Sequence, residues 1–85
     1  MDFRFSKHAL EKMEKRAIER GLVELVLADP QQRVAGHDDI VCYQSTVDMA
    51  GKSFLLRVMV KESVSPHLVV TVYRTSKIGK YQEGI

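Results

Sequence analysis

Residues 53–75 read SFLLRVMVKESVSPHLVVTVYRT, and this stretch decides the fold. Two runs rich in valine, leucine and threonine flank a polar loop around Pro66, which predicts strands over 53–61 and 68–75. Because side chains alternate across a sheet, each strand has two faces. The face expected to pack on helices holds Phe54, Leu56, Val58, Val60, Leu68, Val70 and Val72. The opposite face mixes apolar, hydroxyl and basic groups: Leu55, Arg57, Met59, Val69, Thr71, Tyr73 and Thr75.

Two short helices are predicted near the N-terminus. The first is expected over residues 6–17, since Ser6 is a favourable N-cap and no helix breaker follows it. Its apolar stripe at helical spacing consists of Ala9, Leu10, Met13 and Ala17. The second helix, over 19–28, ends at Asp29-Pro30, because the residue before a proline is disfavoured in helical conformation.

The middle of the chain changes to a period of two. Strands are predicted over 32–35 and 40–47, with turns over 36–39 and 48–52. Residues 76–85 have little apolar content and are expected to form a mobile tail or a short appended element. Short connections favour an antiparallel meander. We therefore expect a single α+β domain over residues 1–85, with two N-terminal helices on one face of a four-stranded, mainly antiparallel sheet.

Length and composition limit the classes of function. Eighty-five residues exclude Rossmann and TIM-barrel domains. The single cysteine excludes an intrachain disulfide and a multi-cysteine zinc site, and it favours a cytoplasmic location. Neither a signal peptide nor a membrane span is expected. The histidines lack metal-ligand spacing and the glycines are scattered singly, so we expect no metal and no cofactor.

The charge is distributed unevenly along the chain. The formal net charge is +2, too small for binding nucleic acid by bulk charge alone. However, residues 1–20 and 61–85 are each net basic, whereas residues 21–60 are net acidic. If the two ends meet in the fold, they form a local positive patch.

The first helix carries one candidate constellation. His8, Lys12 and Arg16 recur at helical spacing, with Lys15 beside them. A histidine with two nearby cations is suited to binding phosphate and transferring a proton near neutral pH. The same pattern is also typical of a solvated helix face on which Glu11 and Glu14 form surface ion pairs.

The end of the last strand carries a second candidate constellation. Tyr73-Arg74-Thr75-Ser76-Lys77 is followed by Lys80 and Tyr81, which places phenols, hydroxyls and cations within nine residues. RNA cleavage by the 2′-hydroxyl needs a base, an acid and cations for the charge that builds on the phosphoryl oxygens. Arginine matches phosphate geometry, and tyrosine stacks on a base or moves a proton. A strand running into a solvated basic tail would have a similar sequence.

Arg57 is a third candidate, because it interrupts an otherwise apolar strand. Arginine is seldom buried without a partner. It is either an anion contact on the open face or the partner of a carboxylate on a neighbouring strand.

The sequence also resembles a known family. Phe5-Ser6-Lys7-His8-Ala9, followed by Lys12-Met13 and Arg16-Ala17-Ile18, resembles the HAxxRMxxRxI opening of a family of small bacterial domains of unknown function, similar to RelE-type and BrnT-type toxins. The resemblance continues through Asp29-Pro30, Val41-Cys42-Tyr43, Leu56-Arg57-Val58 and 70–77, although Lys12 replaces the usual arginine. It implies a RelE-like scaffold whose toxin members cut RNA without a metal.

Carried onto this chain, the resemblance implies a toxin-like, metal-independent endoribonuclease. Its expected catalytic set is His8, Arg16, Arg57, Tyr73, Arg74, Lys77 and Tyr81. Such a protein would have RNA as substrate and an antitoxin-like protein as partner. Two other classes remain open: a non-catalytic RNA- or protein-binding module that uses the face with Arg57, Thr71 and Tyr73, and a homodimeric structural domain.

Overall fold

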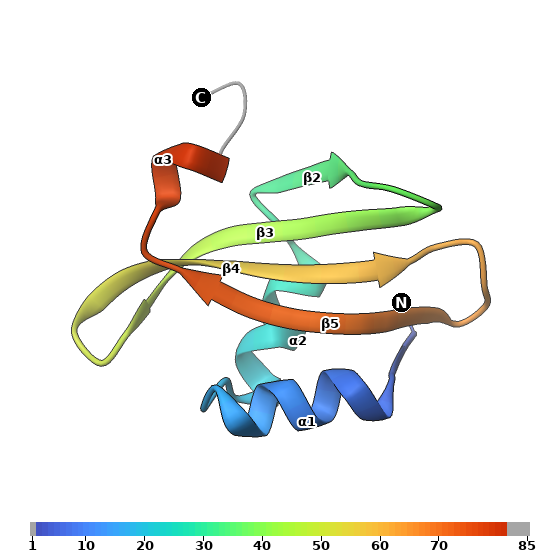
Figure 1. The fold of residues 1–85 in the computed structure, drawn as a ribbon, viewed down its shortest axis with the longest axis horizontal. Coiled ribbons are helices and arrows are strands. Elements are labelled where there is room, and N and C mark those ends of the chain that lie inside the picture. The colour runs from blue at the N-terminus through green and yellow to red at the C-terminus, as the bar shows by residue number, and fades with distance from the viewer. Residues whose placement is uncertain (1, 82–85) are drawn as a thin grey trace.

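The computed structural model describes residues 2–81, the last of them through its backbone alone. Five strands and three helices follow one another along the chain (Figure 1). Their order is β1 (Phe3–Phe5), α1 (Lys7–Lys15), α2 (Arg20–Ala28), β2 (Gln32–Ala35), β3 (Ile40–Met49), β4 (Lys52–Lys61), β5 (His67–Thr75) and α3 (Ile78–Tyr81). The two predicted helices and the four predicted strands are therefore present, with ends that differ by at most a few residues.

The sheet is mixed and has five strands in the order β1-β5-β4-β3-β2. Strands β2 to β5 form an antiparallel meander, whereas β1 pairs in parallel with β5 through Phe3↔His67 and Phe5↔Val69. The predicted fold class is thus wrong: the RelE-like arrangement of two helices on a four-stranded, mainly antiparallel sheet lacks β1 and α3. Strand β1 was not predicted because its three residues are too few to show the alternation of a strand. Its pairing partner, β5, also lies more than sixty residues away in the sequence.

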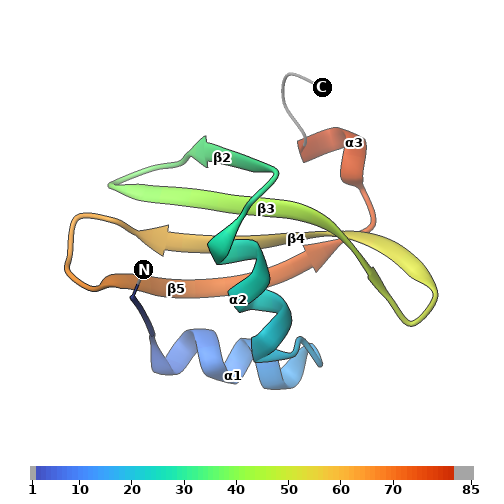
Figure 2. The same ribbon diagram turned by 180° about the vertical axis from the view of Figure 1, so that it is seen from behind.

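Helices α1 and α2 cover one face of the sheet (Figure 2). Helix α1 packs along β5, while α2 packs across β3 and β4. Between the helices and the sheet lies one apolar core, formed by Ala9, Met13, Ile18, Val23, Val26, Leu27, Tyr43, Leu56, Val58, Val60, Val69 and Val72. The other face, which Figure 1 views, carries neither α1 nor α2 and is called here the open face.

The faces predicted for β5 are wrong because this strand contains a β-bulge. The register pairs Met59 with Thr71 but Val60 with Val69, so that Val70 is inserted between two ladder positions. Val69 is consequently fully buried in the core instead of lying on the open face. A strict alternation cannot locate such an insertion, because the extra residue reverses the faces of everything beyond it.

Helix α1 begins and ends with well-defined caps. The Ser6 side chain accepts a hydrogen bond from the Ala9 backbone N–H at 3.0 Å. At the other end, the Ile18 N–H donates to the Met13 carbonyl and the Ala17 N–H to the Glu14 carbonyl, at 2.8 and 3.2 Å. This is a Schellman motif in which Ala17, with φ of 54°, occupies the left-handed position that glycine favours.

We expect Ala17→Gly to stabilise the protein by about 0.5–1 kcal/mol, because glycine removes the steric cost of the left-handed conformation. Urea unfolding measures this difference. The control is Ala28→Gly at the end of α2, where the backbone is helical and glycine is expected to destabilise. Equal losses of stability in both variants would contradict the assignment.

No helix within the described residues has the length and apolar character needed to cross a membrane.

Candidate functional site

Four polar side chains form a row across the open face. The register pairs Gln32 with Gln44, Gln44 with Arg57, and Arg57 with Tyr73, so one residue comes from each of β2, β3, β4 and β5. We call these four residues the polar row. Since paired residues on neighbouring strands point to the same face, the row runs perpendicular to the strands.

Side-chain hydrogen bonds connect every member of the polar row. The Gln44 amide donates to Gln32 Oε1 at 2.8 Å, and Arg57 Nε donates to Gln44 Oε1 at 2.9 Å. The Arg57 guanidinium also donates to the Tyr73 hydroxyl, and its carbon lies 5.6 Å from the centre of the Tyr73 ring. The contacts with Gln44 and Tyr73 orient the guanidinium through hydrogen bonds.

Two further rows flank the polar row. On one side lies an apolar row of Val34, Cys42 and Met59, which ends at Thr71. On the other side Leu55 lies between Thr46 and Thr75. None of the residues in these three rows carries a carboxylate. The centre of the open face is therefore a polar and apolar platform whose charged member is Arg57.

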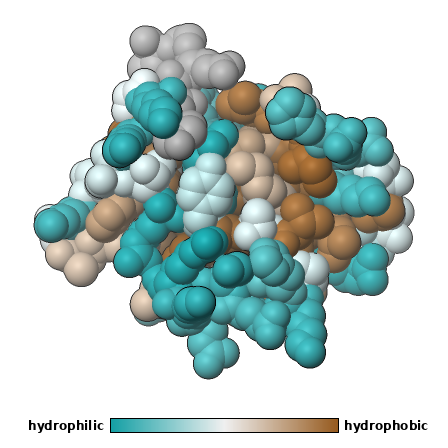
Figure 3. All heavy atoms as spheres, in the orientation of Figure 1, coloured by the Kyte–Doolittle hydropathy of each residue, from teal (hydrophilic) through white to brown (hydrophobic). Residues whose placement is uncertain are grey.

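A shallow groove of about 540 Å³ runs over the apolar row and reaches Arg57. Its walls include Val34, Ile40, Cys42 and Met59. Figure 3 views this face and shows apolar surface gathered beside hydrophilic surface, away from the β3–β4 hairpin. A guanidinium at the edge of an apolar groove suits a ligand that has an anionic backbone and flat apolar faces.

Cys42 in this groove is not an activated nucleophile. The thiol is buried, and this burial raises its pKa above the ordinary value despite the nearby Arg57. A raised pKa keeps the sulfur protonated near neutral pH, and its S–H donates to Gln44 Oε1 at 3.6 Å. Cys42 therefore serves the packing and hydrogen bonding of the platform.

Two of the predicted catalytic arginines lie on the helix side of the sheet. The Arg16 guanidinium donates to the Val72 carbonyl at 2.6 Å, and the Arg74 guanidinium donates to the Arg16 carbonyl. Arg74 also stacks 5.2 Å from the centre of the Phe54 ring. These bonds tie the end of α1 to β5. Because Arg74 follows Tyr73 directly in a strand, the two side chains point to opposite faces.

The remaining predicted residues do not gather at one place. His8 is exposed in the first turn of α1, about 12 Å along the helix axis from Arg16. Lys77 is exposed just beyond β5, where its N–H donates to Thr75 Oγ1 at 3.1 Å. The side chain of Tyr81 lies outside the described part of the chain. The structure thus joins Arg57 with Tyr73, and Arg16 with Arg74, as two separate pairs.

Gln32 and Gln44 are not among the site residues predicted from the sequence. Gln44 is 0% exposed although it lies on the open face, which is unusual for a glutamine. The sequence offered no clear signal for either residue, because Gln32 lies between Gln31 and Arg33 and Gln44 precedes Ser45 and Thr46. Only the register shows that the two side chains meet.

A second polar cluster, formed by Arg33, Tyr43 and Glu62, lies on the helix side of the sheet near the end of β4. The Tyr43 hydroxyl and the Arg33 guanidinium both donate to the Glu62 carboxylate. The bond from Tyr43, aided by Arg33, holds the pKa of Glu62 below its usual value, while burial raises the pKa of Tyr43. The Phe3 ring packs edge-on at 5.9 Å from the Tyr43 ring. This cluster fastens β2, β3 and the start of the β4–β5 loop together.

We expect Glu62→Gln to lower the stability at pH 7 by about 1 kcal/mol, because it removes a charged acceptor of two hydrogen bonds. The folded-state pKa of Glu62 is depressed, so its contribution is present above the unfolded value of about 4.3 and disappears as the pH falls through the folded value. Urea unfolding at pH 7 and near pH 3 should show the difference from wild type shrinking with acid. Glu11→Gln on the exposed face of α1 is the control, and a pH-independent difference at Glu62 would contradict the prediction.

No group of three or more metal-ligating side chains lies together within the described residues.

Comparison with protein families identifies the chain. Residues 5–74 match the domain of unknown function DUF4258. The chain belongs to the DUF4258 family. The DUF4258 match contains the whole polar row and Arg74, and it ends before Lys77 and Tyr81. Neither the curated proteins nor the solved structures contain a significant match to this DUF4258 chain.

Proposed function

We propose that the open face binds single-stranded RNA, with the polar row as the centre of the contact. The observation that carries this proposal is the Arg57 guanidinium, which Gln44 and Tyr73 hold in position at the edge of an apolar groove. Arginine pairs with phosphate in a fixed geometry, and bases stack on flat apolar or aromatic surfaces. The absence of carboxylates from the three rows removes repulsion of the RNA backbone.

Single-stranded RNA fits this surface better than a duplex. The platform presents the ring of Tyr73 beside an apolar groove. Bases are accessible to such a groove only when they are unstacked, as in loops and single strands. A duplex would offer the face its phosphates but no base surfaces.

RNA cleavage is the second candidate, and the contact between Arg57 and Tyr73 favours it. A guanidinium stabilises charge on a phosphoryl oxygen, and a phenol beside it is placed to transfer a proton. This would be the metal-independent endoribonuclease chemistry of RelE-type and BrnT-type toxins, centred on these two residues. His8, Arg16 and Arg74 would take no part, because they lie away from the open face or are bonded to backbone carbonyls.

The experiment compares a fluorescent single-stranded RNA of mixed sequence with the same RNA annealed to its complement. Anisotropy across a salt series should show tighter binding of the single strand, with affinity falling as salt rises. Gel analysis of the same samples separates binding from cleavage. Intact RNA with saturable binding supports the binding module, and specific fragments support the nuclease. No binding at low salt would reject both and favour a protein partner or a homodimer.

A further inference from the structure

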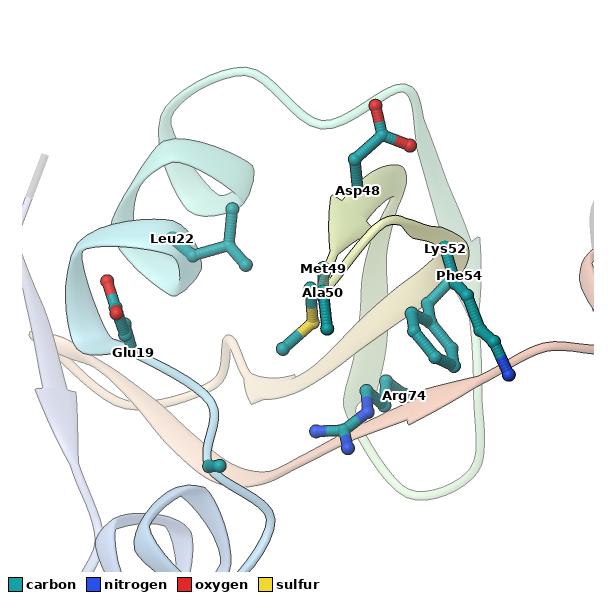
Figure 4. A pocket seen from close by; sticks show the side chains of 9 residues that line it. Glu19, Leu22, Asp48, Met49, Ala50, Lys52, Phe54 and Arg74 are labelled. Atoms are coloured by element: carbon teal, nitrogen blue, oxygen red, sulfur yellow. The ribbon is translucent and has the colours of Figure 1, made fainter.

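A depression of the described surface lies on the other side of the molecule from the polar row. It has a volume of about 670 Å³ and opens between the start of α2 and the β3–β4 hairpin (Figure 4). Volumes of about 300–1,000 Å³ are typical of small-molecule sites. None of the residues assigned to RNA binding lines it, so a function at this place is independent of the open face.

Arg74 lies at the floor of this pocket. Its guanidinium projects from β5 toward the gap between the helices and the hairpin (Figure 4). It donates to the Arg16 carbonyl and lies over the Phe54 ring, and within residues 2–81 it forms no ion pair. A half-buried guanidinium that has further N–H donors and no carboxylate partner is an anion-binding group.

The walls around Arg74 are apolar. Leu22 from α2, Met49 from the end of β3 and Phe54 from β4 line the pocket together with the guanidinium (Figure 4). Ala17 and Ala50 add small apolar side chains to the lining. Such walls favour a ligand that buries hydrocarbon or an aromatic ring next to its charged group, because the apolar contact area adds to the single ionic contact.

The charges at the rim limit the charge of that ligand. Lys52 adds a cation, whereas Glu19 and Asp48 contribute two carboxylates. Asp48 accepts a hydrogen bond from the Ser53 hydroxyl at 2.9 Å, and neither acid forms an ion pair within the described residues. Two carboxylates near the entrance disfavour a dianion more than a monoanion, because repulsion grows with the ligand's charge.

We propose that this pocket binds a small organic monocarboxylate with an apolar body, whose carboxylate pairs with Arg74. Its hydrocarbon or ring lies against Leu22, Met49 and Phe54. The binding does not depend on RNA, because no residue of the polar row lines the pocket.

The test is a titration of the ¹⁵N-labelled protein followed by two-dimensional NMR, near pH 8. Phenylacetate is the probe, benzyl alcohol is its uncharged counterpart, and phenyl phosphate is the dianion. We expect saturable shifts for phenylacetate at amides lining the pocket, with a dissociation constant of about 1 mM. Benzyl alcohol should bind about tenfold more weakly, and phenyl phosphate should also be weaker. Equal affinity for benzyl alcohol, tighter binding of phenyl phosphate, or shifts that do not saturate would overturn the proposal.

Two matched pairs of variants locate the site. Leu22→Trp fills the pocket and should reduce phenylacetate binding about tenfold, whereas Leu25→Trp, at a position 68% exposed on the same helix, should leave it unchanged. Arg74→Lys retains the charge and Arg74→Met removes it, so Arg74→Met should lose more affinity. The titration of the wild-type protein decides the proposal even where a variant does not fold. Identical losses for Leu22→Trp and Leu25→Trp would place the binding elsewhere.

Discussion

Arg57→Met is expected to weaken the binding of single-stranded RNA by about tenfold or more and to reduce the slope of affinity against salt by about one phosphate contact. The guanidinium is the charged centre of the polar row, and its bonds to Gln44 and Tyr73 hold it in position. Methionine fits the strand and keeps most of the side-chain volume, so the loss should come from removal of the charge and of these two hydrogen bonds. If the protein is a nuclease, the same variant should also lose cleavage. Anisotropy titrations at several salt concentrations measure the effect.

The controls for Arg57 use the same kind of change elsewhere. Arg20→Met removes one positive charge from the helix side, where Arg20 pairs with Glu24 at 3.4 Å. It should change RNA affinity by less than about twofold. His8→Ala should likewise leave binding and cleavage unchanged, because His8 lies on α1 and away from the open face. Equal effects of Arg57→Met and Arg20→Met on RNA affinity would show that the protein binds RNA through its overall charge and not through the polar row. Loss of cleavage in His8→Ala would show that the active site includes α1.

Arg16→Met is expected to have the opposite consequence: it should lower the stability by about 1.5–3 kcal/mol and leave RNA binding intact. The Arg16 guanidinium donates to the Val72 carbonyl, and the Arg16 carbonyl accepts from Arg74, so one residue joins α1 to β5 twice. Removing the guanidinium leaves the carbonyl of the fully buried Val72 without this donor. Urea unfolding at pH 7 measures the loss of stability.

The control for Arg16 is again Arg20→Met, whose exposed ion pair should contribute less than about 1 kcal/mol. RNA binding is measured at a temperature at which circular dichroism shows that the Arg16→Met variant is still folded. Unchanged stability together with lost RNA binding would contradict the structural role and make Arg16 part of the RNA contact.

The local elements were predictable because their signals lie within a few residues. Ser6 and Pro30 mark helix ends, and valine-rich alternation marks β4 and β5. Strand β1 was not predictable, because three residues carry no period and its partner β5 is distant in sequence. Their residue types made Arg57 and Tyr73 candidate site residues. Residue type alone could not show that Arg16 and Arg74, which were also candidates, lie on the other side of the sheet.

The amino-acid sequence determined helices α1 and α2, the four meander strands and the presence of basic and aromatic groups suited to a polyanion, since each depends on residue type and short-range spacing. The tertiary structure decided which of those groups meet. The register places Gln32, Gln44, Arg57 and Tyr73 in one row, and the bulge at Val70 turns Val69 into the core. The physical reason is that a single-residue shift between strands reverses every side chain, and long-range pairing fixes that shift.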